Sequence, residues 1–200
     1  MSLESPTPRR RLLDDPRSIR ALAHPIRLQL QSIIGRAGRI TAADAARELG
    51  ISHGLASHHL RQLAKYGFVQ QVDGADNRER PWQLVHTSHS VEGIAAVPGG
   101  NEALAAFEQV AAERALDDLG RWQEQRTGWS TGWLEHAGLS RSTVYLTEEE
   151  FTSLMTAFDA LITAYVEQRP LDDLAARPPG SRAVDLTVIA TPQDPMEAEQ

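Results

Sequence analysis

The stretch that begins at Thr41 constrains the fold more than any other part of the chain. Thr41 can cap a helix over 42–49, because its hydroxyl can accept a hydrogen bond from a free backbone N–H of the first turn. Gly50 suits the left-handed backbone that ends a helix, and Ser52 can cap a second helix over 53–66. The sequence therefore predicts two short helices joined by a tight turn.

The second of these helices has two different faces. Its apolar side chains fall at i, i+4 and i+7 and form one stripe, Ala56, Leu60 and Leu63. The other face is small, polar or basic and carries His53, Gly54, Ser57, His58 and Arg61. Such a helix can pack one face on a protein core while the other enters a DNA major groove.

A β-hairpin is expected after the second helix. Residues 68–72 and 82–85 contain β-branched and aromatic side chains, which favours two strands. The polar turn between them carries Arg78 and Arg80. We interpret this hairpin as a wing beside the two helices.

Three motifs in this region resemble the winged helix-turn-helix of ArsR-type bacterial transcriptional regulators. They occur in the order and spacing of that family and cover roughly residues 17–86. They read Leu22-Ala23-His24-Pro25-Ile26-Arg27, Ser57-His58-His59-Leu60-Arg61-Gln62-Leu63 and Gly67-Phe68-Val69. The resemblance implies a sequence-specific DNA-binding regulator that works as a dimer, most often a repressor.

The first turns of the second helix are the expected base-reading part. Serine and histidine can hydrogen-bond base edges, and a leucine can contact a thymine methyl group. The candidate residues are Ser52, His53, Gly54, Leu55, Ser57 and His58. Arg61 and Lys65 lie further along and should meet phosphates, as should Arg78 and Arg80 of the wing. The alternative for the second helix is an ordinary surface helix, and the alternative for the wing is that its arginines are simply solvated.

Charge is divided unevenly along the chain, whose formal net charge is −7. Residues 9–86 hold 13 Arg/Lys against 7 Asp/Glu, or +6. Residues 87–200 hold 7 Arg against 19 Asp/Glu, or −12. A basic first part joined to an acidic second part indicates that the first part has an anionic partner, double-stranded DNA.

Around the helix-turn-helix we expect a DNA-binding domain over 16–90, preceded by a flexible arm at 1–15. A first helix is predicted from about Pro16 to Gly35. Pro25 lies inside it and lacks a backbone N–H, so a kink or break is expected near His24.

The second half is predicted to fold as helix, strand, helix, strand. The predicted elements are a linker at 91–100, a helix from Asn101 to Arg126 capped by Asn101, a strand at 143–146, a helix opened by a Thr147 capping box, a strand at 183–190, and a disordered tail at 192–200. The fold class is thus α+β, mainly helical, with a C-terminal domain over 101–191. The first helix and the 101–126 helix are candidates for dimerisation, unless both apolar faces are used within one subunit.

No cofactor and no metal site is predicted. The chain has no cysteine, so a thiolate metal site and a disulfide are excluded. His86 and His89, with Glu92 nearby, are a spaced set, but three such residues near a strand end give only a weak zinc signal. An organic effector would suit a pocket lined by Trp122, Trp129, Trp133, Tyr145 and Phe158, although an ordinary core explains the same residues.

Nothing in the sequence indicates an enzyme. It has no Ser-His-Asp pattern in a supporting context, no Gly-rich phosphate loop and no closely paired acid motif. No run of 18 apolar residues and no secretory signal is visible, which favours a cytoplasmic protein. The alternative to a regulator is a winged-helix scaffold for protein interactions that does not bind DNA specifically.

Overall fold

The structure is a computed structural model that describes residues 10–73, 80–86, 88–91, 93–170 and 173–194. The described chain is mainly helical with two small sheets. Its helices are α1 Pro16–Leu22, α2 Pro25–Ala37, α3 Ala42–Leu49, α4 His53–Lys65, α5 Gly100–Glu124, α6 Thr131–Leu134 and α7 Glu148–Gln168. Its strands are β1 Arg10–Leu12, β2 Arg39–Ile40, β3 Val69–Gln71, β4 Trp82–Leu84 and β5 Ser88–Ser90.

The break predicted before Pro25 separates α1 from α2. Asp15 caps α1, and its carboxylate accepts hydrogen bonds from the N–H groups of Arg17 and Ser18 at 3.1 and 3.3 Å. His24 caps α2, because its Nδ1 accepts the Ile26 N–H at 3.2 Å. One helical sequence pattern is thus divided into two helices, as expected for a proline that cannot donate to the preceding turn.

The helix-turn-helix and the wing form as predicted. Gly50 ends α3 in the left-handed conformation, with φ 64°. Strands β3 and β4 pair antiparallel, and β2 pairs with the other edge of β4 to give the order β2-β4-β3. The residues 74–79 at the tip of the wing, including Arg78, lie outside the described residues. The prediction of a mainly helical fold with a winged helix-turn-helix is therefore confirmed.

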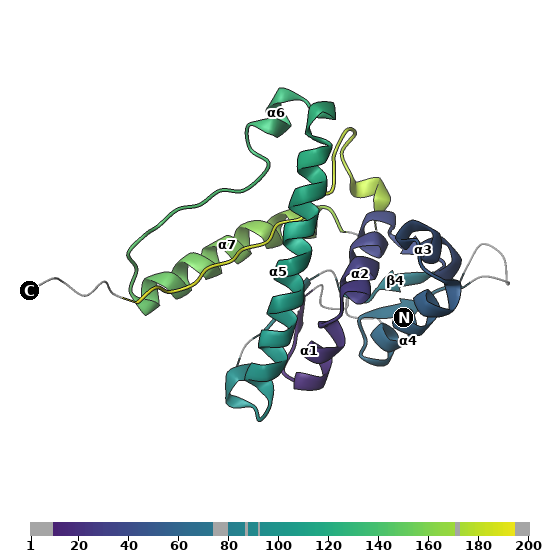
Figure 1. Ribbon diagram of the computed structural model, residues 1–200, viewed down its shortest axis with the longest axis horizontal. Coiled ribbons are helices and arrows are strands. Elements are labelled where there is room, and N and C mark those ends of the chain that lie inside the picture. The colour runs from purple at the N-terminus through teal and green to yellow at the C-terminus, as the bar shows by residue number, and fades with distance from the viewer. Residues whose placement is uncertain (1–9, 74–79, 87, 92, 171–172, 195–200) are drawn as a thin grey trace, which may run out of the picture.

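The core of this first half lies between α1, α2, α4, the start of α5 and the β2-β4-β3 sheet (Figure 1). Its largest fully buried side chains are Phe68, Ile19, Leu30, Ile34, Leu60, Leu63 and Val69. Their burial fixes α4 against the rest of the domain and leaves its other face to solvent.

Parts of the predicted flexible arm and of the predicted linker belong to this core. Within the predicted arm, residues 10–12 form β1, which pairs in parallel with β5, and the next residue, Leu13, is only 2 % exposed. Within the predicted linker, Ile94 is buried in a 3-10 turn, η1 Ile94–Ala96. The prediction of a loose arm was wrong for residues 10–13, because this short segment gains its order from a distant partner, which local composition does not reveal.

Helix α5 starts one residue earlier than predicted and is not capped by Asn101. Its N-cap is Gly99, with φ 74° and no capping side chain. At Gly100, an added Cβ would lie 1.9 Å from the carbonyl oxygen of Ile94. Glycine is required there because α5 begins in direct contact with η1.

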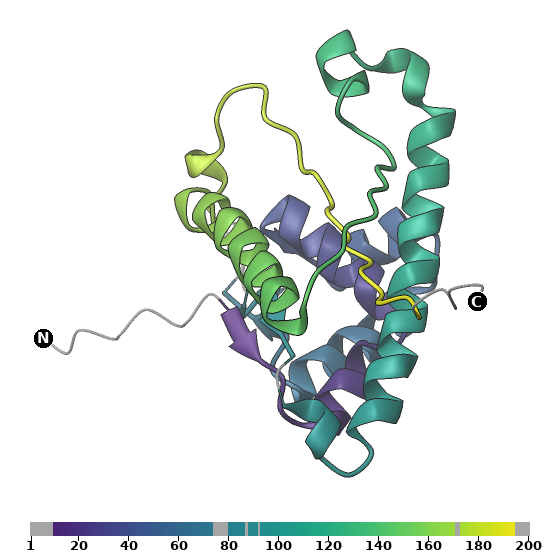
Figure 2. The same ribbon diagram turned by 90° about the vertical axis from the view of Figure 1, so that its left-hand side faces the viewer.

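The second half has helices but no sheet among its described residues. Residues 143–146 and 183–190, both predicted to be strands, are extended chain without strand pairing. Helix α7 has the predicted capping box, with Thr147 and Glu150 bonded reciprocally, yet none of its residues is buried. Figure 1 shows α7 directed away from α2–α4, and the second view separates it from α5 (Figure 2).

One side chain ties the second half back to the first. The Arg177 guanidinium, just after the 3-10 turn η3 Leu174–Ala176, donates hydrogen bonds to the carbonyls of Arg36 and Gly35 at 2.7 and 3.0 Å. These carbonyls belong to the last turn of α2, which has no helical partner for them. Arg177 therefore acts as a C-terminal cap supplied from a distant part of the chain.

Candidate nucleic-acid interface

Helix α4 presents the predicted face to solvent. Ser52 caps it, accepting the Leu55 N–H on its Oγ at 3.2 Å. The inward positions Ala56, Leu60 and Leu63 are buried. Ser52, His53, Gly54, Leu55 and His58 are exposed, and Ser57 is half-buried. All six predicted base-reading residues thus lie on the first two turns of one helix, on the side away from the core.

The predicted phosphate contacts extend this surface. Arg61 and Lys65 are exposed on the same helix, one and two turns further along. Arg80 is exposed two residues before the second wing strand, β4, and Arg78 lies outside the described residues. The exposed part of α4 therefore has serine and histidine side chains at its N-terminal end and Arg61 and Lys65 toward its C-terminal end.

Histidine 59 faces the protein rather than the solvent. It is 6 % exposed, and its ring packs on that of His24 with centroids 4.3 Å apart. His58 lies on its other side, at 5.2 Å. His59 thus joins α4 to the N-cap of α2. It supports the exposed surface of α4 from the inside and is not part of that surface.

Two histidines of this cluster, His24 and His59, have pKa values below the ordinary value. Burial is the main cause that lowers the pKa of His59, to about 4, and the neighbouring His24, Arg27 and His58 lower it further. Burial is also the main cause that lowers the pKa of His24, and Arg27 and His58 lower it further. A neutral His24 can keep Nδ1 unprotonated, as its role as an acceptor for the N–H of Ile26 requires.

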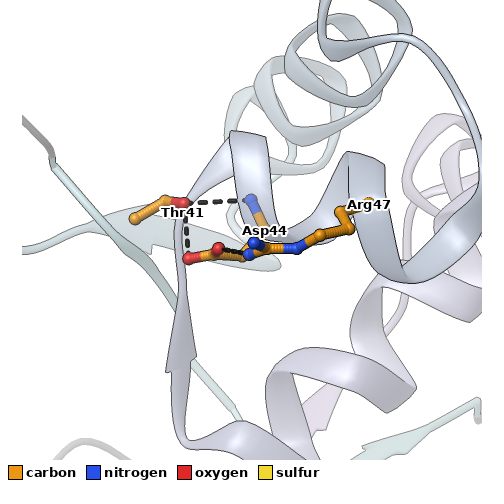
Figure 3. Close-up of polar contacts among 3 residues, drawn as sticks. All are labelled: Thr41, Asp44 and Arg47. Carbon is orange, nitrogen blue, oxygen red and sulfur yellow. Dashed lines mark hydrogen bonds and ion pairs between the residues drawn. The ribbon is translucent and has the colours of Figure 1, made fainter.

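The N-terminus of α3 carries a second polar cluster, made of Thr41, Asp44 and Arg47 (Figure 3). The Thr41 hydroxyl donates to the Asp44 carboxylate at 2.8 Å and accepts the Asp44 N–H at 3.1 Å. Arg47 pairs with the other oxygen of that carboxylate. The capping role of Thr41 was predicted, whereas the arginine pair was not, although the spacing of three residues on a helix could have indicated it.

Arg11 is a supporting residue that sequence reasoning missed. Its guanidinium donates to the backbone carbonyl of Tyr66, the C-cap of α4, and lies 5.0 Å from the ring centroid of Phe68. Arg11 of strand β1 therefore caps the C-terminal end of α4. No local pattern in the sequence pointed to this contact, because 55 residues separate its two partners.

Metal-binding groups do not gather in the part of the chain that the structure describes, where no set of three or more His, Cys, Asp or Glu residues could hold an ion. His89 packs edge-on against Phe68 at 5.1 Å. Burial, with smaller effects of His86 and Arg11, lowers its pKa to about 4. Glu92, the third member of the weak zinc set, lies outside the described residues.

The five aromatic residues of the predicted effector pocket are not gathered in one place. Trp129 and Trp133 meet edge to face, with centroids 6.0 Å apart. Trp122 lies beneath the Arg126 guanidinium at 5.3 Å. Tyr145 is 99 % exposed and so lines no cavity of the single chain, and Phe158 on α7 is 36 % exposed. Within one chain these rings form neither the predicted pocket nor a second core.

Comparison with protein families agrees with the geometry of the first half. Residues 22–72 match a family model described as a helix-turn-helix domain. This segment is a helix-turn-helix domain. The match spans α2, α3, α4 and β3, which includes every described candidate residue of the surface except Arg80.

Solved structures and curated proteins add little to this domain match. A mutant of ZitR from Lactococcus lactis is 18% identical, with 70% of this chain and 73% of that chain covered and a TM-score of 0.30. A mutant of MarR from E. coli, complexed with operator DNA, is 14% identical. The match covers 72% of this chain and 85% of that chain, with a TM-score of 0.30. The heme sensor PefR from Streptococcus agalactiae, in complex with heme, is 18% identical. The match covers 78% of this chain and 81% of that chain, with a TM-score of 0.33. None of the curated proteins matches this chain.

The described helices were also compared with the length and hydropathy that a membrane span requires. None of them is both long and apolar enough to cross a bilayer.

Proposed function

We propose that this protein is a sequence-specific regulator of transcription that binds double-stranded DNA as a dimer and acts as a repressor in the cytoplasm. The observation that carries the proposal is the division of α4 into a buried apolar face and an exposed polar face within a helix-turn-helix domain. A helix of this kind places its first turns against base edges when it enters a major groove. The ArsR-type relationship rests on the three sequence motifs.

Within this proposal the surface residues have two roles. Ser52, His53, Gly54, Leu55, Ser57 and His58 would lie near bases, while Arg61, Lys65, Arg78 and Arg80 would lie near phosphates. Base contacts decide which sequence is bound, whereas phosphate contacts position the protein on any duplex. A dimer would bind two half-sites about one helical turn apart, and repression would follow from blocking RNA polymerase.

A fluorescence-anisotropy titration tests the proposal. The probe is the duplex upstream of the protein's own gene, and a random duplex of equal length and base composition is the control. Specific recognition predicts binding at least about 1000-fold tighter to the correct site at moderate salt. Equal affinity for both duplexes would refute a specific regulator, and an affinity that does not change with salt would instead favour the protein-interaction scaffold.

Two substitutions on one helix separate the two roles. We expect Ser57→Ala to cost about 1–3 kcal/mol on the preferred sequence and little on random DNA, because it removes a base contact. Arg61→Ala should weaken binding to both duplexes alike and lower the slope of log affinity against log salt by about 1. Arg121→Ala, on the distant helix α5, is the matched control for loss of one arginine. An equal loss from Ser57→Ala on every sequence would argue against base reading.

A further inference from the structure

The second half of the chain exposes apolar side chains to an extent that a single subunit does not explain. Seventeen large apolar side chains are exposed in the described part of the chain, and fifteen of them follow residue 115. On α7 they include Leu154, Phe158, Leu161 and Tyr165, which share one stripe. Exposed apolar side chains that gather in a large patch mark an interface.

The accessible surface of the whole chain exceeds that of a compact monomer. It is 14829 Å² for a chain of 22.0 kDa, whereas a compact monomer of that mass has about 9300 Å². The fifteen terminal residues outside the described ranges account for at most about 2400 Å² of the difference, at about 160 Å² per residue of extended chain. About 3000 Å² of excess surface remains, and obligate dimers bury about 1000–2500 Å² on each partner.

Two extended segments in this half have the composition of strands but no strand partner. In residues 183–190, Val184, Leu186 and Val188 alternate with polar residues, and all three are about half or more exposed. Residues 143–146 contain Val144 and Tyr145 and are also exposed throughout. No backbone hydrogen bond joins either segment to another described residue. Alternating β-branched sequence with free backbone groups is a template for pairing with another strand.

We infer that these segments pair between two copies of this chain, so that residues 183–190 of one copy lie beside 143–146 of the other. The apolar stripe of α7 is then covered in the same assembly. The dimer is part of the function proposed above, and this inference adds which segments join the two copies.

The charge of the two segments is compatible with a second copy as the partner. The second half has a formal charge of −12, which would repel an identical half, yet residues 143–146 carry no charged side chain and 183–190 carry one, Asp185. The two segments therefore meet without bringing acidic groups together. Within one subunit α1 packs on α5, where Ala103 is buried and Leu104 and Phe107 pack against the first core.

Cysteine exchange tests the inference, because the chain has no cysteine of its own and so gives no background cross-linking. One full-length variant carries Val144→Cys and a second carries Leu186→Cys or Val188→Cys. The two are unfolded together, refolded as a mixture and oxidised gently. Pairing between copies predicts a covalent dimer that contains one of each variant on a non-reducing gel. A variant with both cysteines should likewise give covalent dimers.

Two outcomes would overturn the inference. The first is an intrachain disulfide in the double variant with no cross-link in the mixture, because the segments would then pair within one chain. The second is a monomer in light scattering of the unmodified protein. The first result leaves the proposed function untouched, whereas a monomer would also refute the proposed dimer. Specific DNA binding is tested separately by the titration, and its loss would leave the cross-link unchanged.

A matched pair of substitutions gives an independent readout. Leu186→Asp places a charge on the apolar side of the segment and should weaken the dimer at least about tenfold. Thr187→Asp places the same charge on the opposite side of the same extended segment and should leave the dimer intact. Equal effects of the two substitutions on the dimer measured by light scattering would contradict a strand with one buried face.

Discussion

Helices α4 and α7 carry apolar stripes with the same spacing but have different environments. In α4, Ala56, Leu60 and Leu63 occupy i, i+4 and i+7, and all three are buried. In α7, Leu154, Phe158 and Leu161 occupy the same relative positions and are all exposed.

The difference between the two helices lies in their partners. Helix α4 has α2, α3 and the wing strand β3 around it, whereas α7 has no such layer within the chain (Figures 1 and 2). A stripe therefore predicts that a helix needs a partner, and it does not say whether the same subunit supplies one.

The largest expected effect comes from making the same substitution in both helices. Leu60→Ala removes a fully buried side chain and should lower the free energy of unfolding by about 2–5 kcal/mol. Leu161→Ala truncates a side chain that is 65 % exposed, so at concentrations where the chain is monomeric it should change stability by less than about 0.5 kcal/mol. Urea unfolding followed by circular dichroism measures both. Equal losses would show that α7 has a partner within its own chain.

Acid should destabilise the first half through its buried histidines. His59 and His89 have their pKa values lowered to about 4, whereas an unfolded histidine titrates near 6.5. Between these values the unfolded chain binds protons that the folded chain does not. Stability is therefore complete above about pH 6.5 and falls as the pH drops toward 4.

The size of this pH effect can be measured by urea unfolding. At pH 5, each of the two histidines should cost about 1–2 kcal/mol relative to pH 7.5. His59→Gln should reduce the pH dependence by about half, whereas His53→Gln, at an exposed position of the same helix, is the control. A stability that is the same at pH 7.5 and pH 5 would contradict the burial of these rings.

A smaller effect is expected from removing the caps of α3 and α7. Thr41→Ala removes the hydroxyl that accepts the Asp44 N–H and should cost about 1 kcal/mol of global stability, since α3 is part of the first core. Thr147→Ala removes the corresponding bond to the Glu150 N–H. It should reduce helical circular dichroism without moving the main urea transition. A shift of that transition by Thr147→Ala would show that α7 unfolds together with the first half.

Sequence reasoning succeeded where neighbouring residues decide the outcome. The caps at Thr41, Ser52 and Thr147 and the left-handed Gly50 are fixed by the geometry of one helical turn, so residue types alone indicate them. The break before Pro25 has the same local origin. The exposed face of α4 followed from the period of the helix once its apolar side was known.

Reasoning from sequence failed where the partner is far away along the chain. Strand β1 was predicted to be a loose arm, because its order comes from pairing with β5, almost eighty residues later. The contact of Arg11 with Tyr66 and that of Arg177 with the end of α2 likewise join distant segments. Residues 183–190 have the pattern of a strand, but a pattern cannot supply the neighbour that a strand needs.

The sequence by itself determined the helix-turn-helix, its caps and the side of α4 that faces solvent, because these depend on backbone geometry and on a helical period. The tertiary structure alone decided that strand β1 caps α4 and that His59 joins α4 to α2. It also decided that the apolar stripe of α7 stays uncovered in one subunit. The physical reason is that burial is a property of pairs of segments, whereas helix ends and periods are properties of single ones.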